Sequence, residues 1–212
     1  MIEIKHKVSG KVLHRIEADT LKGCHIKCVD LRGANLQNVD LSGSNISGCS
    51  LSEANLQTAN LSNMKMLNCV IQRADFTNAN LSNADLSDNV LDVSKFISVS
   101  AKGCKFRHSK INGGDFSNGN FDNADFFFSE LRSNFTGASL VNANLFGADL
   151  SNADFTRADL RKSTMTDCKI LGAKFEYAKM QESIGTNGQP WGFSSRNASK
   201  KQWWKIWSSA AS

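Results

Sequence analysis

The side chains of this chain that could carry out chemistry begin with a small cluster of potential metal ligands. Cys24, His25 and Cys28 are of the residue types that bind zinc. A structural zinc site takes four such ligands, and no fourth one stands near these three. We therefore expect no metal ion at this place, and no other cofactor.

Aspartates form a second group, because paired carboxylates can act as general acid and general base. Nine of them stand directly before a large apolar residue: Asp30, Asp40, Asp75, Asp85, Asp115, Asp125, Asp149, Asp154 and Asp159. This regular placement indicates a structural role rather than a converging site. The chain also pairs no nucleophile with a base at a recognisable spacing, and no glycine-rich phosphate loop follows a strand. We predict that the protein is not an enzyme.

The elements that hold these residues follow a repeat of five residues. From Leu21 to Leu131, every fifth residue but one is Leu, Ile, Met or Phe. The register then shifts by one residue and continues from Phe135 to Met180. Residues 21–180 contain 39 residues of these four types, and 32 of them lie in this register. Neither a helix of period 3.6 nor a strand of period 2 produces such a pattern.

A second position in each unit of five holds a small residue. This residue is Ala, Ser, Gly or Cys in most units, and it stands two positions before the large apolar residue. Five of the cysteines occupy this small slot: Cys24, Cys49, Cys69, Cys104 and Cys168. The other three positions are mostly polar or charged. We therefore expect one large and one small side chain per unit to be buried. The cysteines then substitute for alanine, and we expect them to be reduced thiols, although Cys49 and Cys69 should stack closely enough for a disulfide.

These units resemble the pentapeptide repeat family, whose unit reads A(D/N)LXX. The segments Ala34-Asn35-Leu36, Ala84-Asp85-Leu86, Ala148-Asp149-Leu150 and Ala158-Asp159-Leu160 match it as they stand. The resemblance covers about residues 21–180. It implies an all-β fold, a right-handed quadrilateral β-helix in which four pentapeptides make one coil. The repeats then amount to a solenoid of about eight coils.

The sequence offers a test of this coil length. If four units complete one coil, residues 20 apart stack on one another. Phenylalanine recurs at this spacing across the register shift, with one step of 19, at Phe76, Phe96, Phe116, Phe135, Phe155 and Phe175. We predict that these six side chains form a stacked column in the core.

The segments on either side of the repeats are expected to cap the solenoid, since open coil edges favour association. Residues 1–20 alternate apolar and charged side chains around a turn at Ser9-Gly10, which predicts a β-hairpin. Residues 181–212 predict a loop and then a short helix that opens with a capping pattern at Ser199 and carries Trp203, Trp204 and Trp207. This helix either packs as a lid on the last coil or contacts a membrane interface, a partner or a second copy.

Charge bears on one specific function of this family. Some pentapeptide repeat proteins protect DNA gyrase by imitating duplex DNA, which carries about one negative charge per 1.7 Å. Residues 21–180 instead contain 17 Lys and Arg against 16 Asp and Glu. This composition disfavours gyrase as the partner, and topoisomerase binding and protection remains the alternative function.

Two groups of outward positions are candidate contact residues. A possible basic patch, free of acids in the sequence, consists of Lys102, Lys105, Arg107 and Lys110. This patch could contact phosphates or an acidic protein. We do not expect direct nucleic-acid binding, because no exposed aromatic residues alternate with the basic ones. Possible partner contacts are Phe127, Phe128 and Phe146, which follow large core positions and should point outward.

We therefore predict a non-enzymatic, bacterial-type pentapeptide repeat protein that acts as a protein-binding scaffold or interaction module. Its partner would be an unknown protein or a second copy bound at an end of the rod. No apolar run reaches the roughly 18 residues that a membrane span requires. The first residues carry charge where a signal peptide would be apolar. We expect a cytoplasmic protein without a transmembrane segment.

Overall fold

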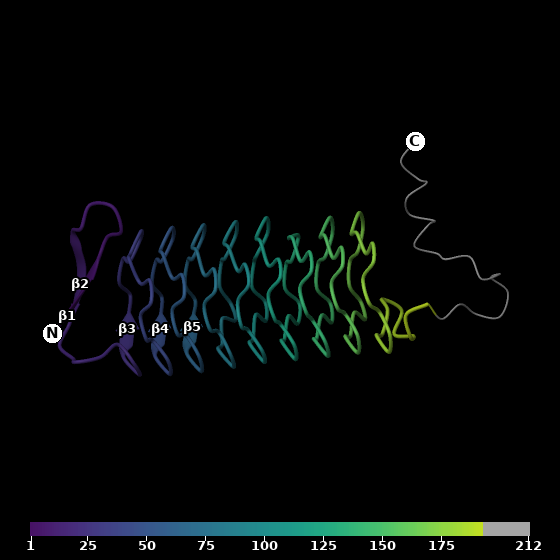
Figure 1. Cartoon of the computed structure of the whole chain (residues 1–212), viewed down its shortest axis with the longest axis horizontal. Coiled ribbons are helices and arrows are strands. Elements are labelled where there is room, and N and C mark those ends of the chain that lie inside the picture. The colour runs from purple at the N-terminus through teal and green to yellow at the C-terminus, as the bar shows by residue number, and fades with distance from the viewer. Residues whose placement is uncertain (193–212) are drawn as a thin grey trace.

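The computed structural model describes residues 1–192 as a rod of stacked coils with a hairpin at its N-terminal end (Figure 1). Strands β1 (Ile2–Lys5) and β2 (Val12–Ile16) pair antiparallel in the hairpin. Strands β3 (His25–Lys27), β4 (Asn45–Ser47) and β5 (Lys65–Leu67) form a parallel sheet in the order β3-β4-β5. The remaining coils are joined by isolated parallel bridges, and the described residues contain no helix.

Residues 20 apart in the sequence lie beside one another in successive coils. Ile26 of β3 pairs with Ile46 of β4, which pairs with Met66 of β5. The bridges keep this step of 20 as far as Lys110–Glu130. The four bridges from Asp115–Asn134 to Glu130–Asp149 have a step of 19, and the step then returns to 20. The register shift in the sequence is therefore one coil that is shorter by one residue.

Ser133 occupies the shortened corner of that coil. Its N–H donates to the carbonyl of Leu131 at 2.8 Å, and its hydroxyl oxygen accepts the N–H of Gly114 at 3.0 Å. The same hydroxyl donates to the carbonyl of Ile111. These bonds satisfy the backbone where the chain is tightened, so the stacking of the coils continues past it.

The recurrent Asp and Asn residues close the turn at each side of the coil. The side-chain oxygen of Asp115 accepts the N–H of Ser117 at 3.0 Å, and many equivalent residues do the same two positions on. Further examples start from Asp30, Asp40, Asn55, Asp75, Asp85, Asp125, Asp149, Asp154 and Asp159. This turn bond explains why carboxylates and amides repeat before the large apolar residues.

The corner of each unit requires a left-handed backbone. At the second residue after the large apolar one, φ lies between about +50° and +70°, as at Asn118 with 57° and Gly113 with 68°. Glycine and asparagine adopt this conformation more readily than other residues. They recur at these corners because the chain must turn sharply there.

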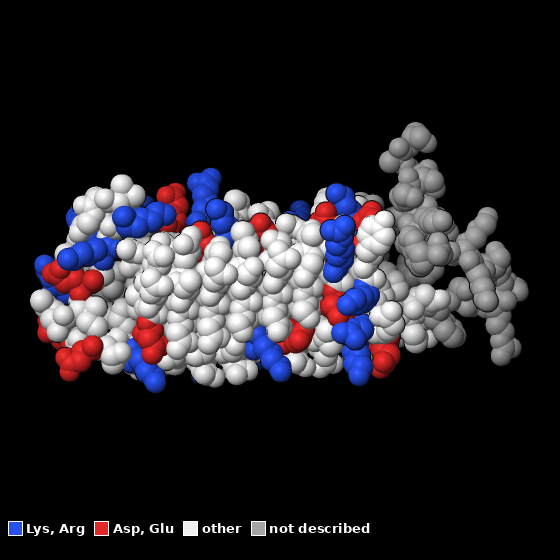
Figure 2. Space-filling model, in the orientation of Figure 1, with Lys and Arg blue, Asp and Glu red and all other residues white. Residues whose placement is uncertain are grey.

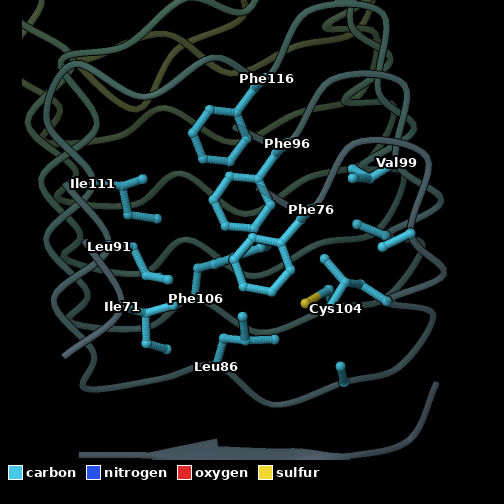
Figure 3. Packing of buried hydrophobic residues seen from close by; sticks show 14 of the residues in the cluster. Ile71, Phe76, Leu86, Leu91, Phe96, Val99, Cys104, Phe106, Ile111 and Phe116 are labelled. Atoms are coloured by element: carbon cyan, nitrogen blue, oxygen red, sulfur yellow. The ribbon is translucent and has the colours of Figure 1, made fainter. Parts of the chain in front are cut away.

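Phenylalanine rings stack along one side of the core (Figure 3). Centroids of successive rings lie 4.6 to 5.3 Å apart along Phe76, Phe96, Phe116, Phe135, Phe155 and Phe175. The first five are fully buried, whereas Phe175 is half-buried and touches the ring of Trp191 at 5.3 Å. Ile71, Leu91 and Ile111 form a second column in the same view. Each fully buried side chain of this size contributes about 1.5–3 kcal/mol.

A column of polar side chains also runs inside the coils, at the small slot of another side. Asn89 is buried; its amide nitrogen donates to the carbonyls of Met66 at 2.5 Å and Leu86 at 2.8 Å. Its amide oxygen accepts the N–H of Cys69 at 2.7 Å. In the next coil, Ser109 accepts the N–H of Asn89 and donates to Leu86. The buried polar atoms of this column therefore bind backbone groups of neighbouring coils.

The hairpin closes the N-terminal end of the rod. The carbonyl of Lys5 accepts the N–H of Asn35 at 2.8 Å, and the N–H of Lys7 donates to the carbonyl of Gly33 at 2.8 Å. The His6 ring lies directly over Gly33, where an added Cβ would stand 2.5 Å from Nε2. Beneath the hairpin the core is covered, since Ile4 is 2% exposed.

The C-terminal boundary differs slightly from the sequence pattern. Parallel pairing continues beyond Met180, because Thr164 still bridges Ile184. The expected helix with Trp203, Trp204 and Trp207 lies outside the described residues.

Candidate interaction surface

Five side chains form a continuous group on the outer surface of three successive coils, and we call this group the aromatic stripe. It consists of Arg107, His108, Phe127, Phe128 and Phe146. The Arg107 guanidinium carbon lies 4.8 Å from the centre of the Phe127 ring, which stacks on Phe146 at 5.6 Å. Alongside, His108 lies over Phe128 at 6.4 Å, and Phe127 meets Phe128 edge to face at 4.6 Å.

Two turn bonds hold the stripe on the rod. Asp125 accepts the N–H of Phe127 at 3.1 Å, and Asn144 accepts the N–H of Phe146 at 3.1 Å. Gly147 provides room for the neighbouring ring, because an added Cβ there would lie 2.7 Å from Phe128. The residues that form the coil therefore also fix the positions of the rings.

Phe128 stands at one of the left-handed corners of the coil, with about half of its side chain exposed. Its φ is 51°, in the left-handed region, and its side chain is 51% exposed. A non-glycine residue in this region costs about 1–2 kcal/mol, and the exposed ring gains little from burial. Phe127 and Phe146 are half-buried because they cover one another. Three phenylalanine rings thus cluster on the outer surface of two neighbouring coils.

In the folded rod, the basic patch lies beside acidic residues of neighbouring coils that are distant from it in the sequence. Arg107 is 3.5 Å from the carboxylate of Asp125, and Lys110 is 3.8 Å from that of Glu130. The backbone of Lys105 pairs with that of Asp85 in one neighbouring coil and with that of Asp125 in the other. Lys102 stands beside the coil of Asp122, whose carbonyl accepts the N–H of Gly103. A stretch without acids in the sequence is thus interleaved with acids of the neighbouring coils, and it forms no uniform positive field.

Opposite charges alternate along the rod from coil to coil. Nine backbone β-bridges place a lysine beside an acid of the next coil. They are Lys65–Asp85, Asp75–Lys95, Asp85–Lys105, Lys95–Asp115, Lys105–Asp125, Lys110–Glu130, Asp149–Lys169, Asp154–Lys174 and Asp159–Lys179. One bridge joins two acids, Glu130 and Asp149. On the face shown in Figure 2, basic and acidic groups lie beside one another around a broad uncharged stretch. Along these columns of residues 1–192, the acids form no continuous strip that resembles duplex DNA.

The acid–acid contact is compensated by a nearby arginine. Arg132 bonds the carboxylate of Asp149 at 2.7 Å. Burial raises the pKa of Asp149, but hydrogen bonds from Arg132 and Ser151 outweigh this effect and hold the pKa at about 2. Asp149 is therefore charged at neutral pH and contributes to stability through this pair.

Reversing one charge tests whether the alternation stabilises the stack. Lys95→Glu would place a third acid between Asp75 and Asp115 in the same column. We expect the free energy of unfolding to fall by about 1 kcal/mol at low salt, because like charges on directly opposite residues destabilise, and by less at high salt. Urea unfolding at two salt concentrations measures this. Lys95→Gln is the control; equal losses for Gln and Glu would rule out the charge effect.

Two of the buried cysteines, Cys69 and Cys168, are poor nucleophiles. Burial raises the pKa of the Cys69 thiol to about 11 and that of Cys168 to about 12, so both are protonated at neutral pH. Cys24 is half-buried and Cys28 exposed, and all six cysteines are free. Among residues 1–192, no group of three or more His, Cys, Asp or Glu is arranged to hold a metal ion.

The structure brings some of the predicted contact residues together and leaves others apart. Phe127, Phe128 and Phe146 meet, and Arg107 of the basic patch joins them. Trp203, Trp204 and Trp207 lie outside the described residues. Sequence reasoning missed His108 as a member of the stripe and the acids that neighbour the patch. Comparing charges at a spacing of 20 would have found those acids.

A rod built from stacked four-unit coils, with inward columns and a polar outer surface, defines a repeat protein of the β-solenoid class. The family models agree: the model described as "Pentapeptide repeat region" matches residues 19–96, and that described as "Pentapeptide repeats (8 copies)" matches residues 131–167 and 148–184. The chain belongs to the pentapeptide repeat family. No curated protein sequence matches it.

Solved structures of other pentapeptide repeat proteins resemble this chain. HetL, a protein involved in heterocyst differentiation regulation from the cyanobacterium Nostoc sp., is 22% identical; the alignment covers 81% of this chain and 91% of HetL, with a TM-score of 0.47. QnrB1, a plasmid-mediated fluoroquinolone resistance protein, is 20% identical, with coverage of 81% and 88% and a TM-score of 0.45. A thylakoid-lumen protein of Arabidopsis thaliana is 28% identical, with coverage of 40% and 60% and a TM-score of 0.39.

Within residues 1–192, no helix is long and apolar enough to cross a membrane.

Proposed function

We propose that this protein is a non-enzymatic scaffold that binds another protein through the aromatic stripe. The observation that carries this proposal is the cluster of outward rings around Phe128, which is 51% exposed and meets both Phe127 and Phe146. Aromatic residues and arginine dominate the energetics of protein interfaces, and Arg107, Phe127 and Phe146 supply both. The partner is a protein of unknown identity or a second copy of the chain.

The proposal includes the architecture in which the stripe is displayed. It is a right-handed, four-sided solenoid of about eight coils, built from residues 21–180. Residues 1–20 cap its N-terminal end, and residues 181–212 cap the other. Such a rod holds side chains at fixed spacings, which favours binding because little conformational entropy is lost on association. We place this scaffold in the cytoplasm of a bacterium.

Imitation of DNA for binding to gyrase is the weaker candidate. The alternating charges oppose it, because lysines stand beside the acids along the described columns. Gyrase binding in the manner of a DNA mimic would require local acidic density, which these columns lack.

Replacing Phe128 by asparagine tests the scaffold proposal. Asparagine suits the left-handed backbone at this corner, so we expect unfolding free energy to change by less than about 1 kcal/mol. Partner binding should weaken at least about tenfold, since truncated interface anchors cost about 2 kcal/mol or more. The measurement compares capture of partner proteins from a cell lysate, and sedimentation of the purified protein, for the original chain and the variant.

Val93→Asn is the matched control, because Val93 is 54% exposed with a φ of 61° and lies outside the stripe. We expect it to leave association unchanged. Equal loss of association in both variants would refute a role specific to the stripe. Inhibition of gyrase supercoiling by the purified protein, retained in Phe128→Asn, would favour the alternative function.

A further inference from the structure

The aromatic stripe lies between two columns of paired residues, which we call the flanking columns. Lys105 stands two residues before Arg107, and Lys110 stands two residues after His108. The first flanking column consists of Asp85, Lys105, Asp125 and Asn144, and the second of Val90, Lys110, Glu130 and Asp149. Two lysines in one coil are thus followed by two acids in the next, one on each side of the stripe.

The charged groups of the flanking columns are accessible to a partner. Lys105 is exposed, and the side chains of Lys110 and Glu130 are 58% and 40% exposed. Glu130 and Lys110 lie 3.8 Å apart, and Asp125 lies 3.5 Å from Arg107. Exposed ion pairs of this kind contribute little energy to the fold. Their charges therefore remain available to a second molecule.

Two copies of the chain are complementary across the stripe in an antiparallel arrangement. Around a twofold axis, a contact of one residue with another is repeated with the two copies exchanged. If the axis passes between the coil of Lys105 and that of Asp125, Lys105 faces Asp125 of the second copy. In the same arrangement, Lys110 faces Glu130 of the second copy. Each pair occurs twice, so opposite charges surround the stripe on both sides.

The same register also matches the members of the stripe to one another. Arg107 faces Phe127 of the second copy, and guanidinium groups stack favourably on aromatic rings. His108 faces Phe128 of the second copy, whose side chain is 51% exposed in the single chain. The contact would therefore cover the most exposed ring of the stripe.

The outer coils introduce no conflict in this register. One coil further from the axis, Asp85 faces Asn144 and Val90 faces Asp149. Beyond these, Lys65 pairs with Asp85 along the first column and faces Thr164, the neighbour of Asn144. Over these coils of residues 1–192, the flanking columns bring no two like charges together.

The neighbouring registers and the parallel orientation place like charges together. An axis through the coil of Asp125 sets Asp125 and Glu130 opposite their own copies. An axis through the coil of Lys105 does the same to Lys105 and Lys110. A parallel pair sets one flanking column opposite the other, lysine to lysine and acid to acid. Facing like charges disfavour an interface, so the alternation selects one arrangement.

We propose that the aromatic stripe binds a second copy of the chain in this antiparallel, side-by-side arrangement. The inference rests on the proposed function, because it names the partner of the stripe. What favours a second copy over an unrelated protein is the self-complementarity of the charges and rings about one axis.

Exchange of one charged pair between two variants tests this dimer. Lys110→Glu sets acids opposite Glu130 of the second copy, and Glu130→Lys sets lysines opposite Lys110. We expect the purified original chain to form a dimer, and each variant alone to dimerise at least about tenfold more weakly. An equimolar mixture should restore the dimer, because both of its cross-pairs are again of opposite charge. Sedimentation at several concentrations measures this, and circular dichroism checks that each variant is folded.

Lys65→Glu is the matched control, since it makes the same charge change in the first column but faces the neutral Thr164. It should leave the dimer unchanged, whereas Phe128→Asn should weaken it at least about tenfold. Carbodiimide cross-linking of mixed isotopically light and heavy chains should join Lys110 of one copy to Glu130 of the other.

Several results would overturn the antiparallel dimer. They are a monomeric original chain at every concentration, a stronger dimer in Lys110→Glu, a mixture that stays monomeric, and equal losses in Lys65→Glu and Lys110→Glu. A monomeric chain that still captures a lysate protein through Phe128 would leave the proposed scaffold function standing and reject only the second copy. A dimer unaffected by Phe128→Asn would instead reject the stripe as its contact surface.

Discussion

Replacing Phe116 by alanine is expected to lower the free energy of unfolding by about 3–5 kcal/mol, the range for phenylalanine truncation in a packed core. Phe116 is fully buried, and its ring stacks between Phe96 at 4.7 Å and Phe135 at 4.6 Å. It also meets Phe106, Phe121 and Phe126 from the sides. The cavity left by its removal would thus interrupt the column at its most crowded point.

Urea unfolding followed by circular dichroism measures this loss. Phe175→Ala is the matched control in the same column, and its half-buried position predicts a clearly smaller effect. Because each coil contacts only its neighbours, the Phe116 variant should also unfold less cooperatively. Equal losses for the two variants would show that the ring stack does not carry the stability of the rod.

The second large effect is expected for Asn89→Leu, at about 3 kcal/mol, because each buried polar group that loses its partner costs about 1–3 kcal/mol. Leucine has a similar size but leaves the N–H of Cys69 and the carbonyl of Met66 without their bonds. The penalty therefore comes from the backbone of the neighbouring coils rather than from lost packing.

Asn89→Ser separates this explanation from a general intolerance of change at the site. Ser94 occupies an equivalent slot, where its hydroxyl accepts the N–H of Ala74 and donates to the carbonyl of Ile71. A serine at position 89 can make the corresponding two bonds, so we expect a loss of no more than about 1 kcal/mol. Thermal and urea unfolding of both variants measure the difference. A serine variant as unstable as the leucine variant would contradict the hydrogen-bond explanation.

The inward half of this structure was predictable, because burial depends on side-chain type at a fixed period. The phenylalanine spacing predicted a column that includes Phe116 and Phe135 across the shortened coil, and the structure stacks these rings. The identity of the family followed from the same register. The left-handed corners were not predicted, although the frequent Asn and Gly at those positions carried the signal.

The outward half was less predictable, because surface chemistry depends on neighbours that are distant in sequence. The stretch from Lys102 to Lys110 contains no acid, yet the next coil places Asp125 beside Arg107. The outward direction of Phe128 followed from the register, but its contact with His108 depends on two coils packing together. A sequence of this kind specifies which residues face outward more readily than what they meet there.

The alternation of lysines and acids gives the surface a longer period than the backbone. The backbone repeats with every coil, but a column such as Lys65, Asp85, Lys105 and Asp125 returns to the same charge only after two coils. Duplicating a single coil, for example residues 81–100, would set Lys95 beside its own copy, whereas duplicating two coils would preserve every pair. Growth of the rod by gene duplication or by design would therefore favour steps of two coils, even though a single coil suffices to continue the core.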